Sequence, residues 1–275
     1  AFTLIFYSFG FKDVIETSSF VIDTITGGYQ PSLERFQQYL SIPTRTFILM
    51  LMFVGSVNFS FNYRLFTLNM KKTLSKETLL YLLVIIIGTV SIFFLSGKNV
   101  FDSLFHVLSM SSSTGYDYIN ISMLNDTVKS VFILLMILGG CGFSMAGGIR
   151  MFRIISFLRS IKQSVEGIPT RENEIRKENQ RAVANNADCL SALVTVLLFV
   201  ANLFIFSVIF TTIGISFTDA LFEVGSALTT NGVSMGATTV FMPIAYKWLL
   251  IIAMIIGRIE MITILIALSP QKRTE

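Results

Sequence analysis

Residues 102–117, DSLFHVLSMSSSTGYD, return in a second version at residues 219–234, DALFEVGSALTTNGVS. The two stretches share Asp, Leu, Phe, Val and Ser at equivalent positions. In each of them the aspartate stands thirteen residues before a glycine, which is Gly115 in the first and Gly232 in the second. A motif that recurs in this way indicates a fold assembled from repeated units.

A looser copy, DVIETSSFVIDTITGGYQ, occupies residues 13–30 and reaches a glycine pair at Gly27 and Gly28. Each copy holds roughly ten apolar or small residues, which at about 1.5 Å per residue cannot cross a hydrocarbon layer roughly 30 Å thick. A long apolar stretch follows each copy, and one also precedes each of the last two. The sequence therefore predicts a repeated unit of helix, short re-entrant helix, extended glycine-ended strand and helix.

The composition places this unit in a membrane. Hydrophobic residues make up 53% of the 275 residues and charged residues only 14%, whereas a soluble domain carries about 25% charged residues. Five stretches are apolar enough, and long enough or nearly so, to span a bilayer: Phe47–Phe61, Leu79–Leu95, Val128–Met145, Leu190–Ile213 and Ile244–Leu268. The opening AFTLIFYSFGF resembles the end of a sixth, and without a basic region before it we expect a missing upstream part rather than a signal peptide.

The net charge of +4 is explained by the way Lys and Arg are distributed between the two sides of the membrane. When loops are assigned alternately to the two sides, most Lys and Arg residues fall on one side, which the positive-inside rule identifies as cytoplasmic. The C-terminus falls on the same side, and nucleic acid is not needed to explain the basic balance. The two cysteines, Cys141 and Cys189, lie in or beside apolar segments and are interpreted as inert small residues.

The run of small hydroxyl residues before Gly115 fits a non-helical segment inside the membrane. Such backbone is tolerated only where protein buries it or water lines it, and carbonyl oxygens from several strands can replace the hydration shell of an ion. The alternative for any one copy is a plain turn after a helix. Asp102 and Asp219 fall at the start of their short helices, where we expect them to cap free amides and to complement the helix dipole.

A second feature is the segment GGCGFSMAGG at residues 139–148, with five glycines in ten residues. Each glycine costs about 1 kcal/mol relative to alanine in a helix, which argues against an unbroken helix here. The segment is either a site of close helix packing or an intramembrane loop. Arg258 lies deep in the last apolar stretch, where its charge either faces an aqueous interior or reaches back to the cytoplasm. Glu260, only two residues on, does not share its helix face, so a partner on the interrupted helix is expected.

Three motifs resemble the Trk/Ktr/HKT superfamily of potassium transporters, and most closely its TrkH-type pore subunits. They are FVGSVNFSFNYRLF from Phe53, LMILGGCGFSMAGGIRMFR from Leu135 and GRIEMITILIALSP from Gly257. The second is similar to a family signature, with Met145 where threonine is usual and Arg150 in place of lysine. The resemblance implies an all-α integral membrane protein with tandem helix–pore loop–helix repeats around a central pore, of which this chain carries three of four.

By position, the resemblance implies a selectivity filter and a gate. The filter residues are Thr26, Gly27, Gly28, Ser113, Thr114, Gly115, Thr230, Asn231 and Gly232, with K⁺ bound at these residues only; the second repeat does not align at fixed spacing, so Gly27 can replace Gly28 as its filter glycine. The gate residues are Gly139, Gly140, Gly142, Ser144, Gly147, Gly148 and Arg258. The implied domains are the second repeat at 1–70, the third at 71–160, a cytoplasmic linker at 161–186 and the fourth repeat at 187–275.

The implied function is potassium uptake across the cytoplasmic membrane through a gated, channel-like pore, with K⁺ as the transported ion and no covalently bound cofactor. The polar stretch at residues 159–186 is either a solvated linker or the contact surface of a cytosolic nucleotide-binding regulatory subunit of the TrkA type. No Gly-Lys-Ser/Thr phosphate-binding loop occurs, so nucleotide control would come from that other chain. A homodimer in contact with membrane lipids is expected.

Two other functions are considered. One is a nonconducting scaffold that lacks a quarter of its pore. The other is an intramembrane protease, because GFSMAG around Ser144 faintly resembles a serine protease motif. A Ser–His site needs a suitably placed base, and the single histidine, His106, falls in a re-entrant helix, where we expect a structural role. An enzyme is therefore not expected.

Overall fold

The computed structural model describes residues 14–27, 41–67, 75–119, 121–166 and 175–259, and every regular element in these ranges is helical. The elements are α2 (Val14–Thr26), α4 (Ile42–Ser56), α5 (Phe59–Phe66), α6 (Lys76–Ser96), α7 (Val100–Ser111), the 3₁₀ turn η2 (Ile121–Met123), α8 (Asp126–Leu138), α9 (Met151–Glu166), α10 (Ile175–Thr211), α11 (Phe217–Leu228) and α12 (Ile244–Ile259).

Within the described residues, two helices are by themselves long and apolar enough to cross a membrane: α6 and the part of α10 from Leu190 to Thr211. Local signals set the ends of α6: the Ser75 hydroxyl accepts the backbone N–H of Thr78 at 3.2 Å, and Gly97 ends the helix with a φ of +63°. Large apolar side chains of α6 point away from the protein, for example Phe94 with 77% of its surface exposed. This outward apolar surface suits contact with lipid rather than water.

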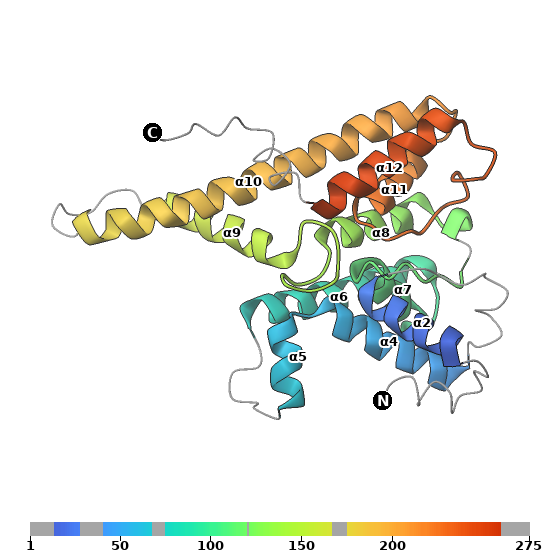
Figure 1. The fold of residues 1–275 in the computed structure, drawn as a ribbon, viewed down its shortest axis with the longest axis horizontal. Helices are drawn as coiled ribbons and strands as arrows, with labels where there is room; N and C mark the ends of the chain where they lie inside the picture. Colours follow the sequence, from blue (N-terminus) through green and yellow to red (C-terminus); the bar gives the residue numbers. More distant parts are fainter. Residues whose placement is uncertain (1–13, 28–40, 68–74, 120, 167–174, 260–275) are drawn as a thin grey trace.

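The short helices α7 and α11 have twelve residues each and lie between longer helices. Helix α7 packs against α6, α8 and α4, and α11 packs against α10, α12 and α8. Figure 1 shows α2, α4 and α7 in the lower half, α11 and α12 in the upper half, and α8 between them. We call a short helix, the strand after it and the helix after that strand a pore unit. The three pore units are built on α2 and α4, on α7 and α8, and on α11 and α12.

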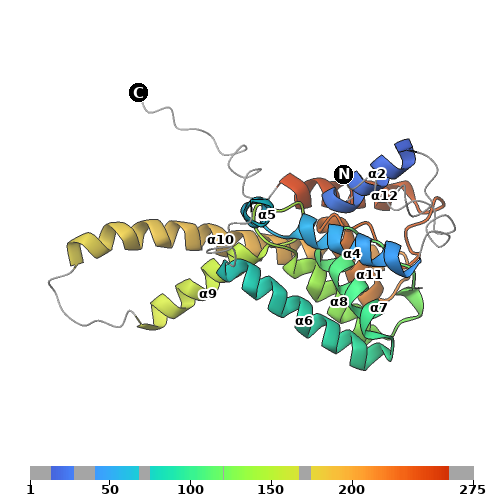
Figure 2. The same cartoon turned by 90° about the horizontal axis from the view of Figure 1, so that it is seen from below.

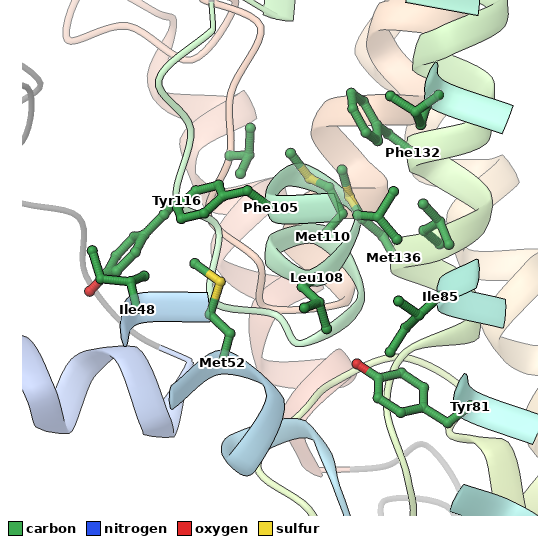
Figure 3. Close-up of a cluster of buried hydrophobic side chains, with 14 of the residues drawn as sticks. Ile48, Met52, Tyr81, Ile85, Phe105, Leu108, Met110, Tyr116, Phe132 and Met136 are labelled. Atoms are coloured by element: carbon green, nitrogen blue, oxygen red, sulfur yellow. The ribbon is translucent and has the colours of Figure 1, made fainter. Parts of the chain in front are cut away.

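Helix α7 is the centre of the larger apolar core (Figure 3). Phe105 and Met110 of this helix are fully buried, and the side chains around them come from α4, α6 and α8. Neighbours on several sides hold a helix in one position because closely packed interiors leave no room for sliding. The strand that leaves the C-terminal end of α7 is therefore fixed by the whole unit.

One expectation about the helices needs correction. The stretch Phe47–Phe61 is not one spanning helix: α4 ends at Ser56, and α5 leaves it at an angle of 119°. The last predicted stretch, Ile244–Leu268, is described as helix only to Ile259, and the opening segment lies outside the described residues.

The glycine-rich break is present, because α8 ends at Leu138 and α9 begins at Met151. The predicted linker at 161–186 also contains regular structure: α9 runs to Glu166, and α10 already begins at Ile175. These two helices contact each other and form an arm that projects from the rest of the chain (Figure 2).

Candidate ion-conducting site

The strands after α7 and α11 have the same unusual backbone. Ser113 and Gly115 have φ values of +60° and +71°, and Thr230 and Gly232 have values of +54° and +84°. Serine and threonine rarely adopt positive φ, so these strands are held in place by their surroundings. A strand with positive φ at every second residue departs from the regular alternation of carbonyl directions, and it can present successive oxygens to one side, as an ion site requires.

The ends of the short helices supply bonds that hold these strands. The backbone N–H groups of Thr114 and Gly115 donate to the Ser109 carbonyl at 3.2 and 3.3 Å. In the other copy Asn231 donates to the Ser226 carbonyl at 2.8 Å. The strand amides are thus bonded back to their own helices, which leaves the strand carbonyls as candidate ligands for an ion.

Gly27, the last described residue after α2, and the strands after α7 and α11 lie side by side in chain order. A Cβ atom built on Gly27, whose φ is +74°, would lie 2.8 Å from the Ser113 carbonyl oxygen. A Cβ atom on Gly115 would overlap the Asn231 carbonyl oxygen and lie 3.0 Å from its Oδ1 atom. A Cβ atom on Gly232 would meet nothing within 4 Å. The first two glycines therefore face the next strand, and the third faces no atom of the described residues.

Buried side chains join the strands across the pore units. The Thr114 hydroxyl donates to the Thr24 carbonyl at 3.2 Å, and the Thr24 hydroxyl is 3.2 Å from the Tyr116 hydroxyl. The Asn231 side-chain amide donates to the Met110 carbonyl at 2.8 Å. The hydroxyl groups of Thr114 and Thr24 and the side-chain amide of Asn231 thus find partners within the protein, which satisfies polar groups that no lipid could satisfy.

The predicted filter residues are brought together in these strands. Thr26 is the last residue of α2, Gly27 follows it, and the other described members occupy the two later strands: Ser113, Thr114, Gly115, Thr230, Asn231 and Gly232. Gly28 lies outside the described residues.

The glycine-rich segment runs directly against the strands that follow α7 and α11. The Gly147 N–H donates to the Ser113 hydroxyl at 2.9 Å, and a Cβ atom on Gly147 would overlap the Thr229 carbonyl oxygen. Two further amides, those of Cys141 and Met145, donate to the Ser56 and Gly55 carbonyls at the end of α4, at 2.9 and 3.1 Å. The segment therefore touches all three pore units.

Two charged residues hold this segment from other helices. Arg258 of α12 donates from Nη1 to the Met145 carbonyl at 3.4 Å, which agrees with a partner on the interrupted helix. Glu77 near the start of α6 accepts the Gly142 N–H with Oε1. The predicted gate residues Gly139, Gly140, Gly142, Ser144, Gly147 and Gly148 all lie in this irregular segment.

Backbone contacts explain why several of these positions are glycine. A Cβ atom on Gly140 would lie 2.7 Å from the Ser56 carbonyl oxygen, and one on Gly148 would lie 2.6 Å from that of Met136. Backbone atoms cannot move aside as a flexible side chain can. Any larger residue would push the segment away from its neighbours.

The aspartates at the starts of the short helices do not act mainly as caps. Ser216 caps α11 by accepting the Asp219 N–H at 3.2 Å, while the Asp219 carboxylate accepts Lys129 Nζ at 2.8 Å. In the other copy Asp102 lies 3.6 Å from Arg45 Nη1. The capping interpretation was therefore wrong for Asp219, and the two aspartates instead join neighbouring pore units.

Sequence analysis missed Glu223, a buried carboxylate in α11 with 3% of its surface exposed. It accepts the Ser234 hydroxyl at 2.7 Å, the Met235 N–H at 2.8 Å and the Thr238 hydroxyl at 2.6 Å. These bonds fix the chain directly after Gly232. The one signal for this role in the sequence is a glutamate among the apolar and small residues that follow Asp219 in α11.

The arrangement does not form a Ser–His pair. The Ser144 hydroxyl donates to the Cys141 carbonyl at 2.5 Å, and the His106 Nδ1 atom lies 2.7 Å from the Asp102 carbonyl oxygen. Both side chains thus bond to the backbone of their own segments. This gives the protease interpretation no support among the described residues.

Comparison with known proteins identifies relatives along most of the chain. The family model described as "TrkH: Cation transport protein" matches residues 26–275. The Trk system potassium uptake protein TrkI of Halomonas elongata is 27% identical over 267 residues, covering 89% of this chain and 53% of that protein. The Ktr system potassium uptake protein D of Bacillus subtilis is 31% identical over 192 residues, covering 66% of this chain and 41% of that protein.

A solved structure has the same fold. The potassium transporter TrkH of Vibrio parahaemolyticus matches 98% of this chain with a TM-score of 0.77 and 17% sequence identity. The match covers 61% of that transporter. An uncharacterized cation transporter of Methanocaldococcus jannaschii is 30% identical over 61% of this chain, and the match covers 35% of that protein. The chain thus spans between about a third and three fifths of the length of these relatives.

Proposed function

The chain belongs to the TrkH family of cation transport proteins, and from this premise we propose that it forms the greater part of a pore that conducts K⁺ into the cell across the cytoplasmic membrane. The observation that carries the proposal is the set of adjacent strands with matched positive φ values at Ser113, Gly115, Thr230 and Gly232. The potassium uptake activity named for two relatives supports the choice of ion.

In this proposal the strands form the selectivity filter, and K⁺ is bound at the filter residues alone. The carbonyl oxygens take the place of water around the ion, so that entry costs little free energy and exit remains fast. The strands occupy three sides of the axis, and the open side of Gly232 is where a fourth strand belongs. The proposed repeats accordingly cover residues 1–70, 71–160 and 187–275, as the second, third and fourth of four.

The glycine-rich segment is the proposed gate. It lies against the inner ends of the strands through Gly147, and Arg258 and Glu77 hold it there. A cation at Arg258 also repels K⁺ from the same space. Movement of this segment away from the strands would open the pore.

The arm of α9 and α10 is the proposed contact for regulation. It lies in the part of the chain richest in Lys and Arg, which the positive-inside rule places in the cytoplasm together with the C-terminus. We assign to it the binding of a cytosolic nucleotide-binding subunit of the TrkA type, and we expect the complete protein to be a homodimer in the membrane.

The test is ion uptake by the complete polypeptide in a cell that lacks potassium transport. Wild type should restore K⁺ uptake, and Gly115→Ser and Gly232→Ser should each relax the preference for K⁺ over Na⁺. Gly97→Ser is the matched control, because Gly97 also has a positive φ of +63° but ends α6 with nothing within 4 Å of a Cβ atom.

Unchanged selectivity in both filter variants would contradict the filter assignment. A complete polypeptide that reaches the membrane and moves no ion would favour the alternative of a nonconducting scaffold.

A further inference from the structure

The two ion pairs between pore units are built in the same way. Arg45 is the fourth residue of α4 and pairs with Asp102, the third residue of α7. Lys129 is the fourth residue of α8 and pairs with Asp219, the third residue of α11. In both cases the last helix of one pore unit supplies the cation and the short helix of the next unit supplies the carboxylate.

The last helix of the third pore unit carries the same cation position. Lys247 is the fourth residue of α12. A glycine stands ten residues after the cation in all three cases: Gly55 in α4, Gly139 directly after α8 and Gly257 in α12. Two independent positions, the cation and the glycine, thus place the three helices in one register.

Lys247 differs from the other two cations in its partner. Its Nζ atom donates to the Val240 carbonyl at 2.6 Å, within the loop that precedes α12. No carboxylate of the described residues forms an ion pair with it, whereas Lys129 lies 2.8 Å from Asp219 and 3.4 Å from Asp126. The cation is in place, and a carboxylate partner would have to come from outside the described residues.

Two further parts of the third pore unit are not covered by any described residue. A Cβ atom on Gly232 would meet nothing within 4 Å, although the equivalent glycine of the preceding unit, Gly115, is in contact with the next strand. Large apolar side chains near Lys247 are also exposed, Ile244 at 71% and Trp248 at 61%. The strand of Gly232 has no described residue against its glycine, and Lys247 has no carboxylate partner among the described residues. Both belong to the third pore unit, which is where a next unit would follow.

We propose that Lys247 forms an ion pair with a carboxylate in the first turn of the short helix of a further pore unit on the same polypeptide. We call it the fourth unit, and it corresponds to the first of the four proposed repeats. This pair closes the ring between α12 and that unit, as Lys129 and Asp219 join the second unit to the third. The inference rests on the proposed function for its ring of four units. It adds to that ring a contact between α12 and the fourth unit, and it specifies that the partner of Lys247 is a carboxylate.

The experiment uses the complete polypeptide, purified in detergent and reconstituted in neutral-lipid vesicles. Lys247→Glu should lower Tm by about 5 °C or more, because it leaves two carboxylates opposed at a partly buried contact. Adding a carboxylate-to-Lys change in the first turn of the fourth unit's short helix should restore at least half of that loss. The swap Lys129→Glu with Asp219→Lys is the reference, and Lys98→Glu, an exposed lysine just before α7, should change Tm by about 1 °C or less.

Several results would overturn the proposal. One is that Lys247→Glu leaves Tm unchanged. Another is that the charge swap between Lys247 and the fourth unit fails to restore Tm, while the swap between Lys129 and Asp219 restores it. A polypeptide that encodes no further short helix with a first-turn carboxylate would also refute it. A Tm loss that appears only with anionic lipid, or only as dissociation of a dimer, would assign Lys247 to a headgroup or to a second copy.

The ion pair and the transport proposal fail separately. If wild type moves no K⁺ but the charge swap at Lys247 restores Tm, the ion pair stands and the proposed function falls. If uptake is normal and Lys247→Glu changes neither Tm nor flux, the proposed function stands and the ion pair falls.

Discussion

Gly147 is the position where one added methyl group should open the pore. Its N–H donates to the Ser113 hydroxyl at 2.9 Å, and a Cβ atom would lie 2.9 Å from the carbonyl carbon of Thr229 and still closer to its oxygen. Because the obstacle is backbone at the end of a pore helix, Gly147→Ala forces the glycine-rich segment away from the filter strands.

The size of the effect follows from the two contacts that are lost. Forcing a methyl group into a closely packed site costs about 1–3 kcal/mol, and loss of the bond to Ser113 costs about 0.5–1.5 kcal/mol. At about 1.4 kcal/mol per factor of ten, a total of about 1.5–4.5 kcal/mol shifts the ratio of closed to open pores by roughly 12- to 1,600-fold. Ser113→Ala removes only the hydrogen-bond acceptor, so its shift should be about 2- to 12-fold.

The assay is Rb⁺ uptake by proteoliposomes that contain equal amounts of the complete wild-type or variant polypeptide, without a regulatory subunit. Uptake should rise in the order wild type, Ser113→Ala, Gly147→Ala, and the double variant should gain less than the sum of the two free energies because both act on one contact. Uptake by Gly147→Ala that equals or falls below wild type, with the protein folded, would refute the reasoning that this contact keeps the pore closed.

Two further substitutions test the same region. Arg258→Ala should raise uptake several-fold, because Nη1 no longer holds the Met145 carbonyl at 3.4 Å and a cation leaves the pore; equal or lower flux in the same uptake assay would count against a gating role. Gly257→Ala should destabilise the protein by about 1–3 kcal/mol in thermal unfolding, because its Cβ atom would lie 2.7 Å from the carbonyl carbon of Leu228. Gly225→Ala, whose Cβ atom would meet only a side-chain atom at 3.7 Å, should be neutral or stabilising by up to about 1 kcal/mol, and equal losses at both glycines would contradict the contact.

The sequence was most informative where a local property decides the structure. The apolar length of Leu79–Leu95 is enough to predict a spanning helix, and α6 covers it as Lys76–Ser96. The glycines at 139–148 are enough to predict a break, and no helix covers them. Repetition of one motif predicted equivalent short helices, since equal sequences in equal surroundings fold alike.

The sequence was least informative where distant segments meet. The end of α4 at Ser56 and the bend before α5 were not predicted, because Phe47–Phe61 was taken as one apolar stretch although Gly55, Ser56 and Asn58, the N-cap of α5, interrupt it. The aspartate at 219 was expected to cap its own helix, and only its neighbour α8 made it a partner of Lys129. Glu223 escaped notice because its partners lie in the loop after the filter strand.

The amino-acid sequence by itself determined the membrane setting, the recurrence of short helices that each lead to a glycine, and the interruption before α9. These depend on residue composition and on spacing along the chain, which act over a few turns of helix. Only the tertiary structure decided that Ser113 and Thr230 have positive φ, that Gly115 lies against Asn231, and that Gly147 lies against the strand ends. Those features require contacts between segments from different pore units, and packing fixes such contacts because a closely packed interior admits only one relative position of its helices.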